Sequence, residues 1–201
     1  MQIDTGYGPA AAELDGLASA RFLLVLTHGA GGGVDSADLL AARDAGLGAG
    51  GAVARVLQPY RVRGARAPGS PQRQDAAWLE IVAVLRDRHP GVPLVQGGRS
   101  NGARVACRTA GPAGATAVLA LAFPLHPPGR PDKSRADELR AAGVDVLVIN
   151  GDRDPFGVPD PGDAARVVVL PGETHALGGA RRAIEREVGS WLSLVLELAP
   201  R

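Results

Sequence analysis

The chain has 201 residues, of which 45% are hydrophobic and 21% charged, a composition typical of a globular protein with a sizeable core. A net charge of +1 and an aromatic content of 3% argue against nucleic acid or an anionic membrane as a partner. Cys107 is the only cysteine, and we find neither a secretory leader nor an apolar run of bilayer length. We therefore expect a cytoplasmic protein. From its length we expect residues 1–201 to form one domain.

Apolar runs that suit buried strands alternate with segments of helical periodicity. In chain order we expect a short edge strand at 2–4, a strand at 22–26, a helix at 35–45, a strand at 52–57, a helix at 74–88, a strand at 92–96, a helix at 103–109, a strand at 115–123, a helix at 134–142, strands at 144–149 and 166–170, and a closing helix. The closing helix carries an apolar stripe: Ala180, Ile184, Val188, Trp191, Val195 and Leu198. Segments 46–51 and 58–71 are expected to be loops, the second of them basic. The alternation predicts an α/β fold with a doubly wound, mostly parallel sheet.

A serine flanked by glycines stands where a predicted strand meets a predicted helix. The pattern Gly98-x-Ser100-x-Gly102 follows the strand at 92–96 and precedes the helix at 103–109. This context predicts a nucleophile elbow, a sharp turn that exposes a serine hydroxyl, because glycines on either side leave room for the turn. A flexible loop is the alternative, since the chain contains 28 glycines.

Two further polar residues, Asp154 and His175, follow the last two predicted strands. An imidazole can take the proton of a serine, and a carboxylate can orient that imidazole. The chain order Ser…Asp…His is the order found in α/β-hydrolases. We therefore predict Ser100, His175 and Asp154 as catalytic residues. Asp152 is the competing acid, and Asp154 is preferred because it lies deeper in the loop beyond the strand.

A glycine-rich loop after the strand at 22–26 is predicted to complete the site. It reads His28-Gly29-Ala30-Gly31, and its backbone N–H groups can approach a substrate oxygen. We assign the oxyanion hole to the backbone amides of Ala30 and Asn101, with Gly31 as the alternative to Ala30. His28 is expected to fix the loop rather than to act as a second base.

Other glycine runs do not match nucleotide-binding loops. Segment 29–34 lacks the third glycine of the dinucleotide fingerprint and the Gly-Lys-Ser/Thr ending of a P-loop. Segment 46–51 matches G-x-G-x-x-G, but it follows a helix and precedes a strand, which is the wrong context. No His, Cys, Asp or Glu cluster has the spacing of metal ligands. We therefore predict neither a cofactor nor a metal.

Four segments together resemble a known family. They read THGAGG at 27–32, GGRSNGARVA at 97–106, FPLHPPG at 123–129 and GDRDPFG at 151–157. In these segments the chain is similar to the KANSL-three/TEX-thirty-type α/β-hydrolase-like family, a relative of dienelactone hydrolases, over nearly its whole length. The resemblance implies an α/β-hydrolase core without a large cap domain. Family members usually show Ser-Met-Gly-Gly-Arg where this chain has Ser-Asn-Gly-Ala-Arg, and some members act as scaffolds.

The favoured hypothesis is a serine hydrolase, carboxylesterase or thioesterase-like, that cleaves a small ester, thioester or related acyl substrate through an acyl-enzyme. Gly31, Leu125 and His126 are the predicted substrate-binding residues, with the loop at 60–66 across the mouth. We expect Arg61, Arg63 and Arg130 to be solvated surface residues rather than ligands of an acidic substrate. The alternative is a hydrolase-fold interaction or scaffold protein with little turnover. The sequence leaves open whether two copies pair as a homodimer.

Overall fold

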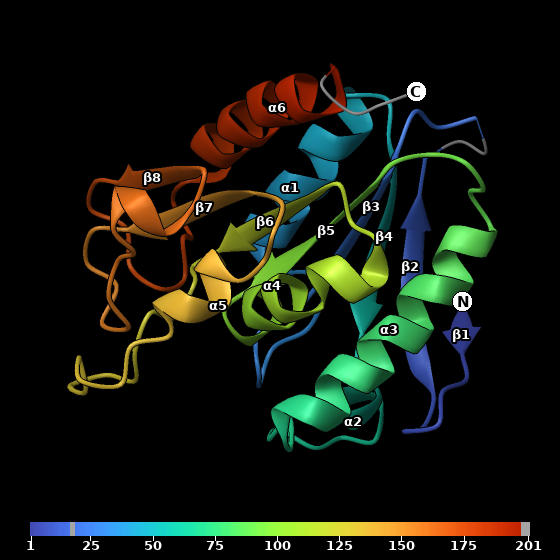
Figure 1. Ribbon diagram of the computed structural model, residues 1–201, viewed down its shortest axis with the longest axis horizontal. Coiled ribbons are helices and arrows are strands. Elements are labelled where there is room, and N and C mark those ends of the chain that lie inside the picture. Colours follow the sequence, from blue (N-terminus) through green and yellow to red (C-terminus); the bar gives the residue numbers. More distant parts are fainter. Residues whose placement is uncertain (17–18, 198–201) are drawn as a thin grey trace.

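The computed structural model describes residues 1–16 and 19–197 of the chain. Its centre is a sheet with the strand order β1-β2-β4-β3-β5-β6-β7-β8 (Figure 1). The strands are β1 (Gln2–Ile3), β2 (Ala10–Asp15), β3 (Leu23–Thr27), β4 (Ala52–Leu57), β5 (Leu94–Arg99), β6 (Ala117–Leu121), β7 (Asp145–Gly151) and β8 (Arg166–Leu170). Strands β3 to β8 are parallel, whereas β1 and β2 form an antiparallel edge. The carboxyl ends of the parallel strands therefore meet at one edge of the sheet.

Helices cover both faces of this sheet. They are α1 (Ala37–Gly48), α2 (Pro59–Val62), α3 (Pro71–Asp87), α4 (Asn101–Ala113), α5 (Ala136–Arg140) and α6 (Arg181–Glu197). Helices α1 and α6 lie side by side on one face, and α3, α4 and α5 cover the other (Figure 1). Within the described ranges, no helix has the length and apolarity that crossing a membrane requires, and no separate cap domain stands over the sheet.

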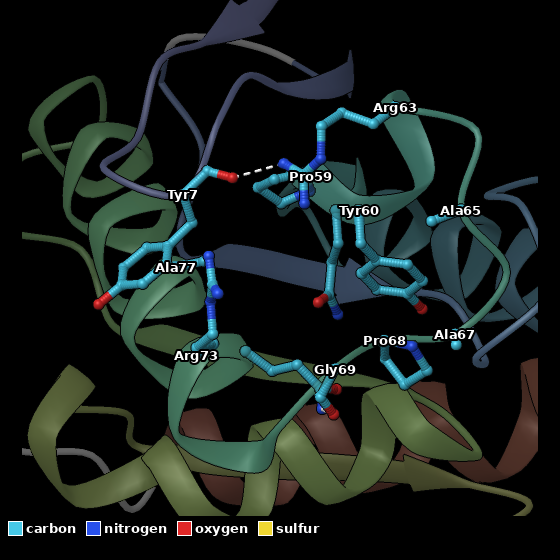
Figure 2. A pocket seen from close by; sticks show the side chains of 12 residues that line it. Tyr7, Pro59, Tyr60, Arg63, Ala65, Ala67, Pro68, Gly69, Arg73 and Ala77 are labelled. Atoms are coloured by element: carbon cyan, nitrogen blue, oxygen red, sulfur yellow. Dashed lines mark hydrogen bonds between the residues drawn. The ribbon is translucent and has the colours of Figure 1, made fainter.

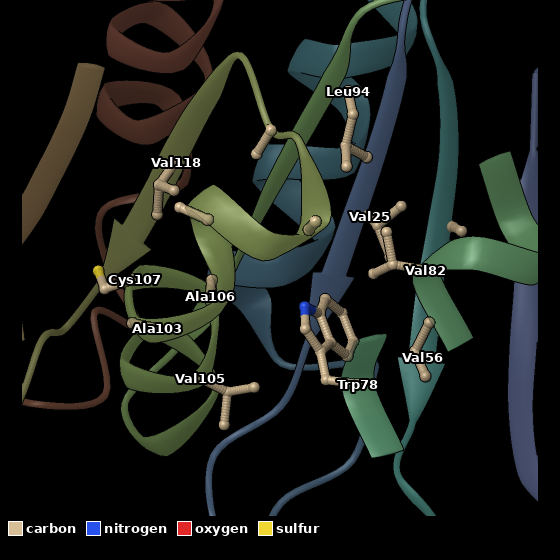
Figure 3. Packing of buried hydrophobic residues seen from close by; sticks show 14 of the residues in the cluster. Val25, Val56, Trp78, Val82, Leu94, Ala103, Val105, Ala106, Cys107 and Val118 are labelled. Atoms are coloured by element: carbon tan, nitrogen blue, oxygen red, sulfur yellow. The ribbon is translucent and has the colours of Figure 1, made fainter. Parts of the chain in front are cut away.

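Successive side chains of the central strands point into opposite helix layers. Val25 of β3 packs with Trp78 of α3, while its neighbours Leu24 and Leu26 pack on the side of α1 and α6. Figure 3 shows Trp78 lying between α3 and the sheet. Because both faces of β3 are covered, a continuous apolar run is what the strand requires. Cys107 is buried in the layer of α4, and burial raises the pKa of its thiol to about 12.

A buried glutamine joins the elements that flank Ser100. The Trp78 indole N–H donates to Oε1 of Gln96 at 2.9 Å. Nε2 of Gln96 in turn donates to the Ala106 carbonyl at 2.7 Å and to Oγ1 of Thr109 at 3.1 Å. The amide thus ties α3, β5 and α4 together, and it satisfies polar groups that would otherwise lie unpaired in an apolar layer.

The predicted α/β fold with a doubly wound, mostly parallel sheet is confirmed, but one strand was not expected. Strand β2 has the sequence AAAELD, which contains no β-branched residue, and it forms by pairing antiparallel with β4. Within segment 58–71, expected to be a loop, the chain forms α2, and α3 begins at Pro71 after the N-cap Ser70. Ser70 followed by Pro71 is a typical start of a helix, which apolar periodicity alone does not reveal.

Three other helices differ in length from the expectation, and α5 covers only Ala136–Arg140 of the expected 134–142. Helix α1 begins at Ala37 with Ser36, not Asp35, as its N-cap, and the Asp35 carboxylate pairs with Arg55 at 2.6 Å. The helix continues to Gly48 through part of the expected loop at 46–51. Helix α4 starts directly after Ser100 and runs to Ala113, beyond the expected 103–109. The apolar stripe of α6 is buried at Ile184, Val188, Trp191 and Val195. Leu198, the last residue of that stripe, lies outside the described residues.

We expect Gln96→Leu to lower the free energy of unfolding by about 1–3 kcal/mol, because it leaves the buried Trp78 N–H without an acceptor. Urea unfolding at neutral pH measures the effect. Gln72→Leu, at an exposed position of α3, is the control and should change the free energy by less than about 0.5 kcal/mol. Equal losses in the two variants would contradict the role assigned to Gln96.

Candidate active site

The turn from β5 into α4 leaves no room for side chains beside Ser100. A Cβ on Gly98 would lie 2.5 Å from the Thr27 carbonyl oxygen, and a Cβ on Gly102 would lie 2.7 Å from the same atom. Ser100 itself has φ 52° and ψ −116°, and its N–H donates to the Leu121 carbonyl at 2.8 Å. A non-glycine residue with positive φ costs about 1–3 kcal/mol and persists only where its surroundings enforce it. This is the strand–turn–helix geometry that the glycine pattern predicts.

Ser100, His175 and Asp154 come together at the carboxyl edge of the sheet. Nε2 of His175 lies 2.8 Å from Oγ of Ser100, and Nδ1 of His175 lies 2.8 Å from Oδ2 of Asp154. The Asp154 side chain is fully buried, whereas His175 is 20% exposed. Asp152, the competing acid, is exposed and accepts the N–H of Gly172 instead. With Nδ1–H directed at Asp154, the other ring nitrogen can accept a proton from Ser100.

The loops that carry Asp154 and His175 are packed against each other. A Cβ on Gly151, at the end of β7, would lie 2.1 Å from the Glu173 carbonyl oxygen, so only glycine permits this approach. The N–H of Phe156 donates to Oδ1 of Asp154 at 2.8 Å, and the Phe156 ring stacks on His175 with centroids 4.3 Å apart. These contacts hold the Asp154 carboxylate and the His175 imidazole at hydrogen-bonding distance from each other.

The glycine-rich loop after β3 lies directly against Ser100. A Cβ on Gly29 would come within 3.3 Å of the Ser100 Cβ. The Tyr60 hydroxyl donates to the Ala30 carbonyl at 2.9 Å, and burial raises the pKa of Tyr60 to about 12, so the phenol remains a donor. Among the described residues, the backbone N–H groups of Ala30 and Asn101 have no acceptor. Both are thus available to a substrate oxygen.

His28 holds the base of this loop. Its ring is fully buried, and Nε2 accepts the N–H of Gln58 at 3.0 Å while Nδ1 lies 2.8 Å from the Gly29 carbonyl oxygen. Burial lowers the pKa of His28 to about 4. A neutral ring that donates through Nδ1 and accepts through Nε2 suits both contacts. This arrangement matches the loop-fixing role expected for His28.

The three predicted substrate-binding residues lie on two sides of the site. Gly31 is exposed on the glycine-rich loop, and Leu125 and His126 are half-buried after β6. The His126 N–H donates to the Phe156 carbonyl at 2.9 Å, so this segment stands beside the ring that stacks on His175. In the described ranges, no group of three or more His, Cys, Asp or Glu side chains is placed to hold a metal ion.

Sequence reasoning missed a pair of charged residues that contact the His175 loop. Nε of Arg99 donates to Oδ2 of Asp38 at 2.8 Å, and a terminal nitrogen of Arg99 donates to the His175 carbonyl at 2.6 Å. Asp38 is fully buried at the start of α1. Because the chain is rich in arginine, no single arginine stood out in the sequence. The position of Arg99 between Gly98 and Ser100 could have indicated that it contacts the site.

Asn150, at the end of β7, is a second residue that sequence reasoning missed. Its Oδ1 accepts the Phe123 N–H at 2.8 Å, and its Nδ2 donates to the carbonyl oxygens of Phe123 at 3.0 Å and Gly157 at 3.2 Å. The fully buried amide therefore joins the loops that follow β6 and β7. A lone amide at the end of an apolar strand is the signal that could have indicated it.

We expect the buried His28 to make folding sensitive to acid. Its pKa is about 4 in the folded chain and about 6.5 in an unfolded chain, so the unfolded state binds the proton first as the pH falls. The contribution is present above pH 6.5 and is lost progressively towards pH 4, by about 3 kcal/mol. Urea unfolding of the native protein and of His28→Asn between pH 4 and 7.5 measures the difference. Parallel stability curves for the two proteins would contradict this assignment.

Comparisons with known proteins agree with the observed architecture. The model of the family described as alpha/beta hydrolase domain matches residues 20–175. Est1E from Butyrivibrio proteoclasticus, solved with ferulic acid, has a TM-score of 0.80 at 16% identity, covering 98% of this chain and 99% of that chain. A serine hydrolase without a lid from Xanthomonas campestris has a TM-score of 0.72 at 20% identity, covering 95% and 93%. Dienelactone hydrolase from Anabaena variabilis has a TM-score of 0.73 at 18% identity, covering 96% and 95%.

At these identities the likeness to solved structures concerns the fold alone. No curated protein matches the sequence. The family model, however, spans well over half of the chain, from the residues before β3 to His175. The chain therefore belongs to the alpha/beta hydrolase domain family.

Proposed function

We propose that this chain is a serine hydrolase of carboxylesterase or thioesterase type. The observation that carries the proposal is the unbroken series of hydrogen bonds from Ser100 through His175 to the buried Asp154. A nucleophile, a base and an orienting acid in this order are what acyl transfer requires. The fold shared with a lidless serine hydrolase and a dienelactone hydrolase supports the same reaction class.

In the proposed reaction, Oγ of Ser100 attacks the acyl carbon while His175 takes its proton. The carbonyl oxygen becomes an oxyanion and accepts hydrogen bonds from the N–H groups of Ala30 and Asn101. His175 then gives the proton to the leaving alcohol or thiol, and Asp154 stabilises the imidazolium throughout. A water molecule, deprotonated by the same imidazole, hydrolyses the acyl-enzyme and releases the acid.

The substrate is proposed to be a small acyl compound, and the protein to work in the cytoplasm. Gly31, Leu125 and His126 are proposed to border the substrate, because they flank the serine–histidine pair on two sides. Gly31 also remains the alternative to Ala30 as an oxyanion donor. Within the alpha/beta hydrolases, the segment FPLHPPG at 123–129 supports a place near the KANSL-three/TEX-thirty-type members.

A fluorophosphonate probe tests the proposal directly. We expect the purified protein to be labelled at Ser100, and Ser100→Ala and His175→Ala to lose labelling, because the probe needs an activated serine. Ester hydrolysis should fall by about 10⁴-fold or more in both variants. Peptide mass spectrometry locates the adduct, and Ser193→Ala, an exposed serine on α6, is the control. Absence of labelling in the folded protein would contradict the hydrolase and favour the scaffold alternative.

We also expect Arg99 to act as a positioning residue for His175. Arg99→Met removes the donor to the His175 carbonyl, and loss of alignment should lower kcat by about 10-fold to 100-fold with little change in KM. Arg104→Met is the matched control, because Arg104 is about as exposed and pairs with Glu138 of α5. Steady-state kinetics and urea unfolding together separate misalignment from a general loss of stability. Equal effects of the two substitutions on kcat would refute the positioning role.

A further inference from the structure

A cavity of about 200 Å³ lies between α2, the first turns of α3 and Tyr7, which precedes β2 (Figure 2). Two of its lining residues are arginines from different segments: Arg63 follows α2, and Arg73 belongs to α3. Arg63 donates to the Tyr7 carbonyl at 2.5 Å, and the Arg73 guanidinium lies 5.8 Å from the centre of the Tyr7 ring. Figure 2 shows both side chains reaching towards Tyr7. We refer to this space as the Arg63–Arg73 cavity.

The Arg63–Arg73 cavity adjoins both halves of the proposed oxyanion hole. Tyr60, one of its lining residues, donates to the Ala30 carbonyl at 2.9 Å. Gln74, another lining residue, accepts from Nδ2 of Asn101 at 2.7 Å. The two residues that supply the proposed oxyanion donors are therefore each in contact with the cavity wall. The cavity wall and the proposed oxyanion hole are thus joined through Tyr60 and Gln74.

The charges around the cavity are not balanced by carboxylates. Neither Arg63 nor Arg73 forms an ion pair with a carboxylate in the ranges that the structure describes. The two acidic side chains nearest to Arg73 in α3 are engaged elsewhere: Asp75 pairs with Arg108, and Glu80 accepts the N–H of Gly6. Two unpaired guanidinium groups at one concave surface favour an anionic ligand, because arginine presents several N–H donors in a fixed fork.

We propose that the Arg63–Arg73 cavity binds the carboxylate end of an anionic acyl substrate whose ester or thioester carbonyl lies at Ser100. This inference rests on the proposed hydrolase function and specifies its substrate class. The cavity volume of about 200 Å³ suits the carboxylate end of a short acyl chain. Both arginines are exposed, as the sequence led us to expect for Arg63, and the proposal adds a ligand for their guanidinium groups.

A pair of matched esters tests the proposal. Mono-4-nitrophenyl adipate carries a terminal carboxylate, and 4-nitrophenyl 6-methylheptanoate replaces that group with an isopropyl group of similar shape. We expect the native protein to favour the adipate ester in kcat/KM, and the ratio of the two values to fall at least 10-fold in the double variant Arg63→Gln, Arg73→Gln. Arg66→Gln should leave the ratio within about 2-fold of native, because Arg66 is equally exposed but does not line the cavity.

Calorimetric titration with free adipate provides a readout that needs no turnover. Adipate should bind Ser100→Ala protein, and the Arg63→Gln, Arg73→Gln substitutions in that background should weaken binding at least 10-fold. An unchanged ester ratio together with unchanged or absent adipate binding would overturn the proposal, even if both esters are hydrolysed. If adipate binds in an arginine-dependent way but the protein neither hydrolyses the esters nor reacts with the fluorophosphonate, the cavity is an anion site and the proposed hydrolase function is wrong.

Discussion

The proposed site depends on how closely β5 and the first turn of α4 approach β3. A Cβ on Gly98 or on Gly102 would lie only 2.5 or 2.7 Å from the Thr27 carbonyl oxygen, closer than real Cβ contacts come. On the other side of β5, a Cβ on Gly97 would lie 2.4 Å from the Leu119 carbonyl oxygen of β6. Only a chain without side chains at these positions can turn there, and the turn places Ser100 in its strained conformation above the sheet edge.

The remaining parts of the site reach Ser100 through loops, and buried polar contacts hold each loop. Arg99 and Asp38 connect the His175 loop to the start of α1, and Asn150 joins the loops after β6 and β7. Because most of these groups are shielded from water, each bond is costly to break and the geometry is defined before any substrate arrives. His28 performs the same task for the oxyanion loop as a neutral ring.

Arginine serves three different purposes in this molecule. Arg104 of α4 forms an ion pair with Glu138 of α5. Arg99 uses its fork of donors to hold a buried carboxylate and a backbone carbonyl at once. Arg63 and Arg73 retain unpaired charge beside a cavity. An arginine-rich composition therefore says little about any one arginine, because the role depends on which acceptors the fold brings near.

The sequence by itself determined the α/β alternation, the turn at Ser100 and the order of Ser100, Asp154 and His175. These features are local: apolar periodicity, glycines two residues from a serine, and polar residues directly after a strand are visible in a short window. Even the preference for Asp154 over Asp152 agrees with the contacts, since Asp152 accepts from the turn after β8 and Asp154 faces His175.

Only the tertiary structure decided the strand β2, the roles of Arg99 and Asn150, and the cavity beside the oxyanion loop. Strand β2 exists because β4 offers it a ladder of hydrogen bonds, despite a sequence with weak strand propensity. Asp38 and Arg99 are 61 residues apart, and Arg99 and His175 are 76 apart. Contacts of this kind arise because the parallel strands bring their carboxyl ends to one edge of the sheet. No local sequence pattern indicates which distant side chains will meet at that edge.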